Sequence, residues 1–100
     1  MQIDKDAIRE ILLVAKRLDE KQLLNAVEGN ISIKRDGLIY VTPSARNKAF
    51  LTEEMIAVTD LDGNQVGGTL KATSELRLHV LTYRMREDIG GIVHAHPAYL

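Results

Sequence analysis

The fold class of this chain is decided by the stretch NISIKRDGLIYVT, residues 30–42. In its first half, Ile31 and Ile33 alternate with polar side chains, which is the two-residue period of a β-strand. Its second half is rich in β-branched and aromatic residues, which favour strands. Asp36-Gly37 separates the two halves, and an Asp-Gly pair between two such runs predicts a tight hairpin. The stretch therefore predicts a pair of antiparallel strands.

Helices are predicted before and after this hairpin in the sequence. Asp4 can cap the first, whose apolar residues recur in steps of three and four as far as about Leu24. Thr73 and Ser74 can cap the second, which spans about residues 74–86. The apolar positions of the first helix are Ala7, Ile8, Ile11, Leu12, Ala15 and Leu18, and those of the second are Leu76, Val80 and Tyr83.

The remaining segments predict further strands and turns. A short capped turn at residues 51–55 precedes a strand at 56–59, and residues 60–64 are predicted to form the tip of a second hairpin. Residues 88–91 end the second helix, and a short strand follows at 92–96. This order predicts an α/β fold with a mixed or largely antiparallel sheet flanked by helices.

Length and composition exclude several classes of protein. The chain has 100 residues, a formal net charge of -1 and no cysteine. It therefore lacks disulfides, thiolate metal ligands and the basic face that a nucleic-acid-binding protein needs. The sequence has no run of ~20 apolar residues and its first residues lack the basic and then apolar layout of a signal peptide, so we expect neither membrane insertion nor secretion. We expect a single cytoplasmic domain over residues 1–100 that binds neither nucleic acid nor membrane. Its apolar final strand predicts a truncation at Leu100.

Two groups of residues are candidates for chemistry at one site. His94 and His96 lie two positions apart on a predicted strand, so both imidazoles project from one face and could ligate a metal ion. Such a pair is also an ordinary surface or core feature. Glu75 in the first helical turn could act as a base, or could only complement the helix dipole. Thr73 and Ser74 could offer backbone amides to a phosphate, or could serve as caps alone.

Five segments resemble, in order and spacing, the class II aldolase and adducin head family. The segments are GNIS at 29–32, TPS at 42–44, the Asp62-Gly63 turn, Thr73-Ser74-Glu75 followed by His79 and Tyr83, and VHAHP at 93–97. The resemblance implies that residues 1–100 are the N-terminal part of a longer class II aldolase-like domain. It also implies a homo-oligomer, expected to be a tetramer.

The resemblance further implies a divalent metal ion, with zinc expected, at Glu75, His94 and His96. A third histidine of the family, further along its chain, has no counterpart among these 100 residues, and His79 is expected to pack or support rather than ligate. Glu75 is implied to be the catalytic acid/base. The residues implied to bind a substrate phosphate are Gly29, Asn30, Ser44, Ala45, Thr73 and Ser74. Ala45 departs from the glycine that is usual in the family.

The activity that the resemblance implies is metal-dependent cleavage of a ketose 1-phosphate into dihydroxyacetone phosphate and an aldehyde. Glu75 would move the proton next to the substrate carbonyl. The alternatives are a sugar-phosphate epimerase or a methylthioribulose-phosphate dehydratase of the same family, and a metal-free adducin-like association module. Related epimerases carry aspartate where this chain has Glu75, and adducin-like members lack the histidines that correspond to His94 and His96.

Overall fold

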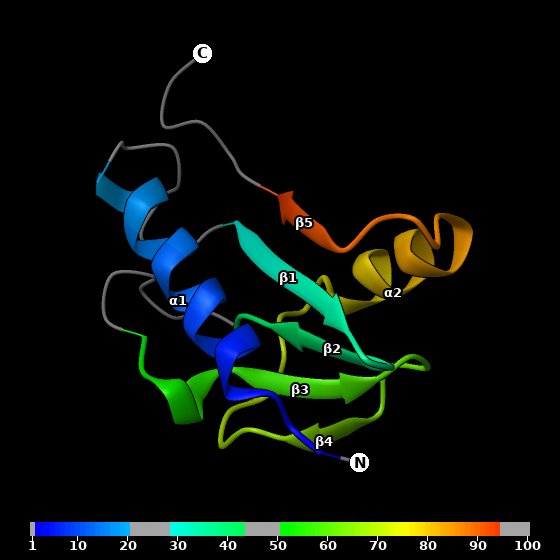
Figure 1. Ribbon diagram of the computed structural model, residues 1–100, viewed down its shortest axis with the longest axis horizontal. Coiled ribbons are helices and arrows are strands. Elements are labelled where there is room, and N and C mark those ends of the chain that lie inside the picture. Colours follow the sequence, from blue (N-terminus) through cyan, green and yellow to red (C-terminus); the bar gives the residue numbers. More distant parts are fainter. Residues whose placement is uncertain (1, 21–28, 44–50, 95–100) are drawn as a thin grey trace.

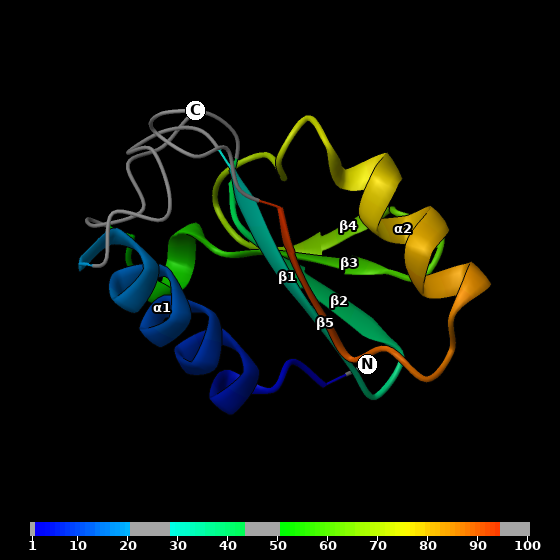
Figure 2. The same ribbon diagram turned by 90° about the horizontal axis from the view of Figure 1, so that it is seen from above.

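Two helices cover opposite faces of one antiparallel sheet in the computed structural model, which describes residues 2–20, 29–43 and 51–94. The helices are α1 (Lys5–Glu20) and α2 (Leu76–Met85), and Figure 2 shows the sheet between them. The strands are β1 (Asn30–Arg35), β2 (Leu38–Val41), β3 (Ala57–Asp60), β4 (Gln65–Gly67) and β5 (Gly91–His94), and the 3-10 helix η2 is Glu53–Met55. The predicted α/β class, with helices flanking a largely antiparallel sheet, is confirmed.

The sheet has the order β4-β3-β2-β1-β5, which Figure 1 displays from bottom to top. All four neighbouring pairs of strands are antiparallel. The connection from β4 to the last strand, β5, contains α2 and crosses to the other edge of the sheet. Strand β5 therefore pairs with β1 rather than with β4, the strand that precedes it in sequence. This crossover brings the end of β5 beside the start of β1.

The hairpin that links β1 and β2 is confirmed. Arg35 pairs with Leu38, and the two residues between them have positive φ angles, 51° at Asp36 and 82° at Gly37. Two residues with positive φ are what a type I′ turn requires, and its twist matches that of the strands. The Asp-Gly pair therefore sets the register of the sheet's central strands.

Strand β2 is buried on both faces because a helix covers each side of it. Its alternate side chains enter two separate apolar clusters, Leu38 and Tyr40 on the α1 side and Ile39 and Val41 on the α2 side. The first cluster also contains Ala7, Ile8, Ile11, Ala15, Ile31, Ile33, Ile56 and Val58, and the second contains Ala57, Ala72, Val80 and Tyr83. The apolar stripes predicted for both helices are thus confirmed.

The boundaries of the helices agree with the sequence only in part. Asp4 caps α1 as predicted, because its carboxylate accepts a 2.8 Å hydrogen bond from the amide of Asp6. The expected end of this helix near Leu24 lies outside the described residues. Helix α2 begins at Leu76, two residues later than predicted, because Ser74 and Glu75 form a turn before it. Within the described residues, no helix has the length and apolar character needed to span a membrane.

Candidate functional site

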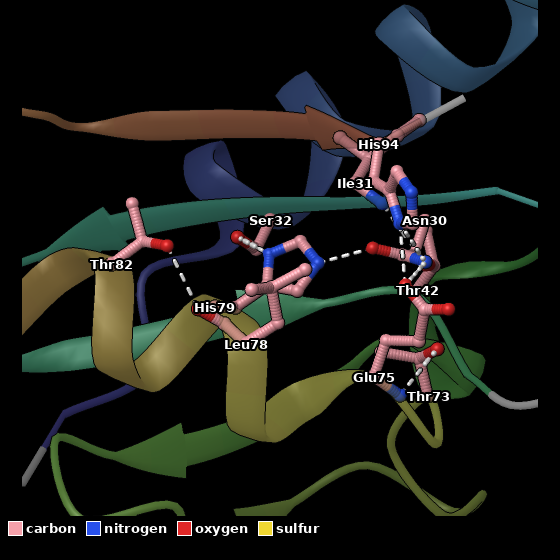
Figure 3. Close-up of polar contacts among 10 residues, drawn as sticks. All are labelled: Asn30, Ile31, Ser32, Thr42, Thr73, Glu75, Leu78, His79, Thr82 and His94. Carbon is pink, nitrogen blue, oxygen red and sulfur yellow. Dashed lines mark hydrogen bonds and ion pairs between the residues drawn. The ribbon is translucent and has the colours of Figure 1, made fainter.

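Three polar side chains from three elements meet at one end of the sheet. Asn30 begins β1 and His94 ends β5, and the two residues are direct partners in the antiparallel register. Their side chains therefore lie on the same face of the sheet. Glu75, at the N-cap position of α2, reaches over that face, and Figure 3 shows the three side chains together.

Polar contacts join these three side chains directly. The Oε2 atom of Glu75 contacts Nδ1 of His94, and Asn30 Nδ2 donates a 3.3 Å hydrogen bond to the same carboxylate oxygen. Asn30 Nδ2 also lies 3.5 Å from His94 Nδ1. The side chains of Glu75 and His94 are 39% and 33% exposed, whereas Asn30 is only 3% exposed. A partly exposed carboxylate and a partly exposed imidazole thus lie above a buried amide.

A second set of polar side chains lies buried beneath them. His79 is fully buried in α2, with its Nε2 bonded to Asn30 Oδ1 and its Nδ1 2.6 Å from Ser32 Oγ. Ser32 Oγ in turn lies 2.7 Å from the hydroxyl of Tyr83. We call these four residues, Asn30, Ser32, His79 and Tyr83, the buried network.

Burial determines the protonation states within the buried network. Burial, the larger cause, and the nearby His94 together lower the pKa of His79 to about 4, while Glu75 opposes the change. His79 is therefore neutral at neutral pH. Burial also raises the pKa of Tyr83, against the opposing effect of its hydrogen bond with Ser32, so its hydroxyl keeps its proton.

The predicted phosphate-binding segments approach one another beside this site. The amide of Thr73 donates to the carbonyl of Thr42 at 3.0 Å, and the Thr42 hydroxyl accepts from the amide of Ile31 at 3.2 Å. These bonds place the turn before α2 against the start of β1, next to Gly29. Thr73 itself is buried, and its Oγ1 accepts a 3.4 Å bond from the Glu75 amide, whereas Ser74 is exposed.

The structure thus brings together Gly29, Asn30, Thr73, Ser74, Glu75 and His94 from the predicted site. Ser44, Ala45 and His96 lie outside the described residues. Sequence reasoning placed Ser32 in the alternation of β1 and in the family-like segment GNIS, but it did not predict the contact with His79. A signal existed, because Asn30 and Ser32 share one face of β1, and His79 and Tyr83 share one face of α2.

The partly exposed side chains of this site are of the chemical types that bind divalent metal ions. Carboxylate oxygen and imidazole nitrogen, which Glu75 and His94 provide, are ligands that zinc takes in proteins. Among the residues that the structure describes, no three histidine, aspartate or glutamate side chains gather as a complete ligand set. The described part therefore contributes two of the three predicted ligands to one place.

Fold and site together define an α/β sandwich domain with a carboxylate, an imidazole and an amide at one end of its antiparallel sheet. The chain belongs to the family described as the Class II Aldolase and Adducin N-terminal domain, whose model matches residues 9–100.

Known proteins of this family resemble the chain over nearly its whole length. An L-fuculose phosphate aldolase of Methanococcus maripaludis is 36% identical over 92 residues, which are 92% of this chain and 50% of that protein. A methylthioribulose-1-phosphate dehydratase of Pseudoalteromonas translucida is 29% identical over 96 residues, 96% of this chain and 46% of the relative. A solved L-fuculose 1-phosphate aldolase superposes with a TM-score of 0.91 at 33% identity, covering 97% of this chain and 47% of that one. The chain spans about half the length of these relatives.

Proposed function

We propose that this chain belongs to a metal-dependent aldolase that reversibly cleaves a ketose 1-phosphate, such as L-fuculose 1-phosphate, into dihydroxyacetone phosphate and an aldehyde. The observation that supports this proposal most strongly is the cluster of Glu75, Asn30 and His94, because it joins a proton-transfer group to a potential metal ligand. The similarity to proteins named L-fuculose phosphate aldolase supports the choice of substrate class.

Glu75 is proposed as the catalytic acid/base. Its carboxylate is partly exposed, so a substrate proton can reach it, and it accepts a hydrogen bond from Asn30 Nδ2. A carboxylate held in this way can accept a proton from a bound substrate. In the condensation direction Glu75 would take a proton from the carbon beside the carbonyl of dihydroxyacetone phosphate, and in cleavage it would give that proton back to the same carbon as the carbon–carbon bond breaks.

Glu75, His94 and His96 are proposed to hold a divalent ion, and zinc is the ion that this ligand set suits. When bound, such an ion supplies positive charge that stabilises the negative charge developing on the substrate oxygen. His94 can provide an imidazole ligand at this site because it lies at the end of β5, opposite Asn30 of β1. The proposal assigns His79 no ligand role because it is fully buried and bonded through both ring nitrogens.

The substrate phosphate is proposed to bind at the turn before α2 and the segments beside it. The residues concerned are Gly29, Asn30, Ser44, Ala45, Thr73 and Ser74. Backbone amides at the beginning of a helix attract anions, because they point outward without partners in the helix. The exposed Ser74 and the positive φ of 84° at Gly29 support a close approach of an anion to this region.

A dehydratase acting on methylthioribulose 1-phosphate is the second candidate, because relatives with that name match the chain at 29% and 34% identity. The two reactions use similar sugar 1-phosphates, so the same phosphate-binding segments would serve either of them. An adducin-like association module is disfavoured by the cluster of Glu75 and His94. A cytoplasmic homotetramer remains a prediction for the full-length protein.

Substrate assays on the full-length protein test the proposal. The purified protein, supplied with zinc, is incubated in parallel with L-fuculose 1-phosphate and with methylthioribulose 1-phosphate, and dihydroxyacetone phosphate and loss of water are measured. We expect dihydroxyacetone phosphate from the first and little turnover of the second. Turnover of methylthioribulose 1-phosphate alone would replace the aldolase proposal with the dehydratase, and turnover of neither would reject both.

A further inference from the structure

We propose that Ser32, His79 and Tyr83 are positioning residues that fix the orientation of the Asn30 carboxamide, so that its Nδ2 group rather than its oxygen faces Glu75. The consequence for turnover rests on the proposed function. The orientation itself does not, since it follows from the hydrogen bonds of the buried network together with the one from Asn30 to Glu75.

The direction of each hydrogen bond follows from the chemistry of its atoms. Asn30 Oδ1 has no hydrogen, so His79 Nε2 must donate in their contact. A neutral imidazole carries a single N–H, so His79 Nδ1 must accept, and the Ser32 hydroxyl donates to it over 2.6 Å. The one hydrogen of Ser32 is then used.

Tyr83 completes the series. Its hydroxyl lies 2.7 Å from Ser32 Oγ, and it must donate because Ser32 has no second hydrogen to give. Donation therefore proceeds in one direction, from Tyr83 to Ser32, from Ser32 to His79, and from His79 to Asn30. Asn30 Nδ2 is left to donate to Glu75.

The reversed arrangement places two acceptors against each other. If the Asn30 carboxamide rotated by half a turn, its oxygen would face the Glu75 carboxylate and its Nδ2 would face His79 Nε2. His79 Nε2 would then have to accept a hydrogen bond from Asn30 Nδ2, so the proton of His79 would move to Nδ1. The Ser32 hydroxyl would in turn have to accept a hydrogen bond from Nδ1. Each neutral tautomer of His79 thus corresponds to one orientation of Asn30.

Because the buried network is shielded from water, its hydrogen bonds cannot be exchanged for hydrogen bonds to solvent. The exposed fractions are 3% at Asn30, 1% at Ser32, 0% at His79 and 3% at Tyr83. Within the described part of the chain, no buried side-chain nitrogen or oxygen lacks a hydrogen-bond partner. Removing one member leaves its neighbour unsatisfied in a buried place, which is costly.

The tautomer of His79 is the direct test. In protein labelled with ¹⁵N at histidine, long-range ¹H–¹⁵N correlation spectra at neutral pH distinguish a protonated Nε2 from a protonated Nδ1. The His79 signals are assigned by their loss in His79→Gln. We expect the Nε2–H tautomer. The Nδ1–H tautomer, an equal mixture of the two, or a doubly protonated ring would each overturn the proposal.

Variants then test whether the orientation matters for turnover. His79→Gln keeps an N–H donor near the position of Nε2, whereas His79→Met keeps the bulk and removes the donor. We expect the Met variant to lose roughly 10- to 100-fold in kcat/KM, the usual effect of losing such a supporting partner, and Gln to recover most of that loss. Equal losses in both variants would contradict a positioning role.

Two controls keep this test decisive. Thr82→Val removes a hydroxyl from the same helix. That hydroxyl donates to the Leu78 carbonyl and lies outside the buried network, so its loss should leave turnover unchanged. If His79→Met does not fold, Ser32→Ala replaces it, and a wild-type kcat/KM in a folded Ser32→Ala protein would count against the proposal. A correct tautomer in a protein without aldolase activity would reject the proposed function and leave the orientation of Asn30 standing.

Discussion

Asn30 and His94 face each other across β1 and β5, with Asn30 Nδ2 lying 3.5 Å from His94 Nδ1. This pairing depends on the crossover that carries the chain over α2 before β5 joins the sheet beside β1. The same crossover places Glu75, at the start of α2, against both residues. A site built from three elements therefore depends on one strand pairing.

Loss of the His94 imidazole should weaken metal binding without unfolding the protein. The full-length protein is expected to bind about one divalent ion per subunit, and His94→Ala should lower its zinc affinity strongly because one of few ligands is removed. Metal titration with a chelating indicator measures this affinity, and thermal unfolding of the metal-free protein provides the control. Unchanged stoichiometric zinc binding in His94→Ala would show that the ligands lie elsewhere.

Removing the hydroxyls before α2 should affect substrate binding more than chemistry. Thr73→Ala and Ser74→Ala are expected to raise KM more than they lower kcat, because phosphate contacts stabilise ground and transition states alike. Steady-state kinetics with a ketose 1-phosphate and with the same sugar lacking phosphate separates the two effects. If the unphosphorylated sugar is cleaved as efficiently as the ester, phosphate does not bind there.

Acid should destabilise the fold through His79. Its pKa is about 4 in the folded protein against an ordinary value of 6.5, so the unfolded chain binds more protons between these values. Stability therefore falls as the pH drops from about 6.5 to about 4, by at most about 3 kcal/mol, and this contribution changes little outside that window. Urea unfolding at several pH values measures this slope. His79→Gln should reduce the slope, and an identical slope in that variant would contradict the assignment.

Two glycines with positive φ should differ in their tolerance of alanine. A Cβ at Gly68 would lie 2.5 Å from the Ile56 carbonyl oxygen, whereas one at Gly37 would meet no atom within 4 Å. Gly37→Ala should therefore cost about 1 to 2 kcal/mol from backbone conformation alone, and Gly68→Ala should cost clearly more. Denaturant unfolding of both variants compares them, and equal costs would show that the backbone near Ile56 moves aside.

Local features of the fold could be predicted because each is decided by residues close in sequence. The Asp36-Gly37 turn, the Asp4 cap and the apolar stripes of the helices are of this kind. The start of α2 was less predictable, since Thr73 and Ser74 both have capping side chains while the helix begins only at Leu76.

Long-range features of the site were beyond sequence patterns alone. The alternation in β1 suggests that Ser32 is a polar outer residue, but α2 covers that face and Ser32 is 1% exposed. The contacts of Glu75 with Asn30 and His94 depend on which strands pair, and the order of elements does not specify this. Resemblance to a family brought these residues into one predicted site, and the described contacts now join three of them.

The most direct test of the proposed mechanism is the kcat of Glu75→Gln in the full-length protein. Glutamine keeps the size and most hydrogen bonding of the side chain but cannot take up a proton. We predict that aldol cleavage, measured at saturating zinc, falls by roughly 10² to 10⁴-fold while the thermal midpoint of the metal-free protein stays near that of the wild type. A side chain that only complements the helix dipole would instead change stability by about 0.3 to 1 kcal/mol and leave turnover intact. Turnover near the wild-type value in a folded, metal-loaded Glu75→Gln protein would contradict the catalytic role.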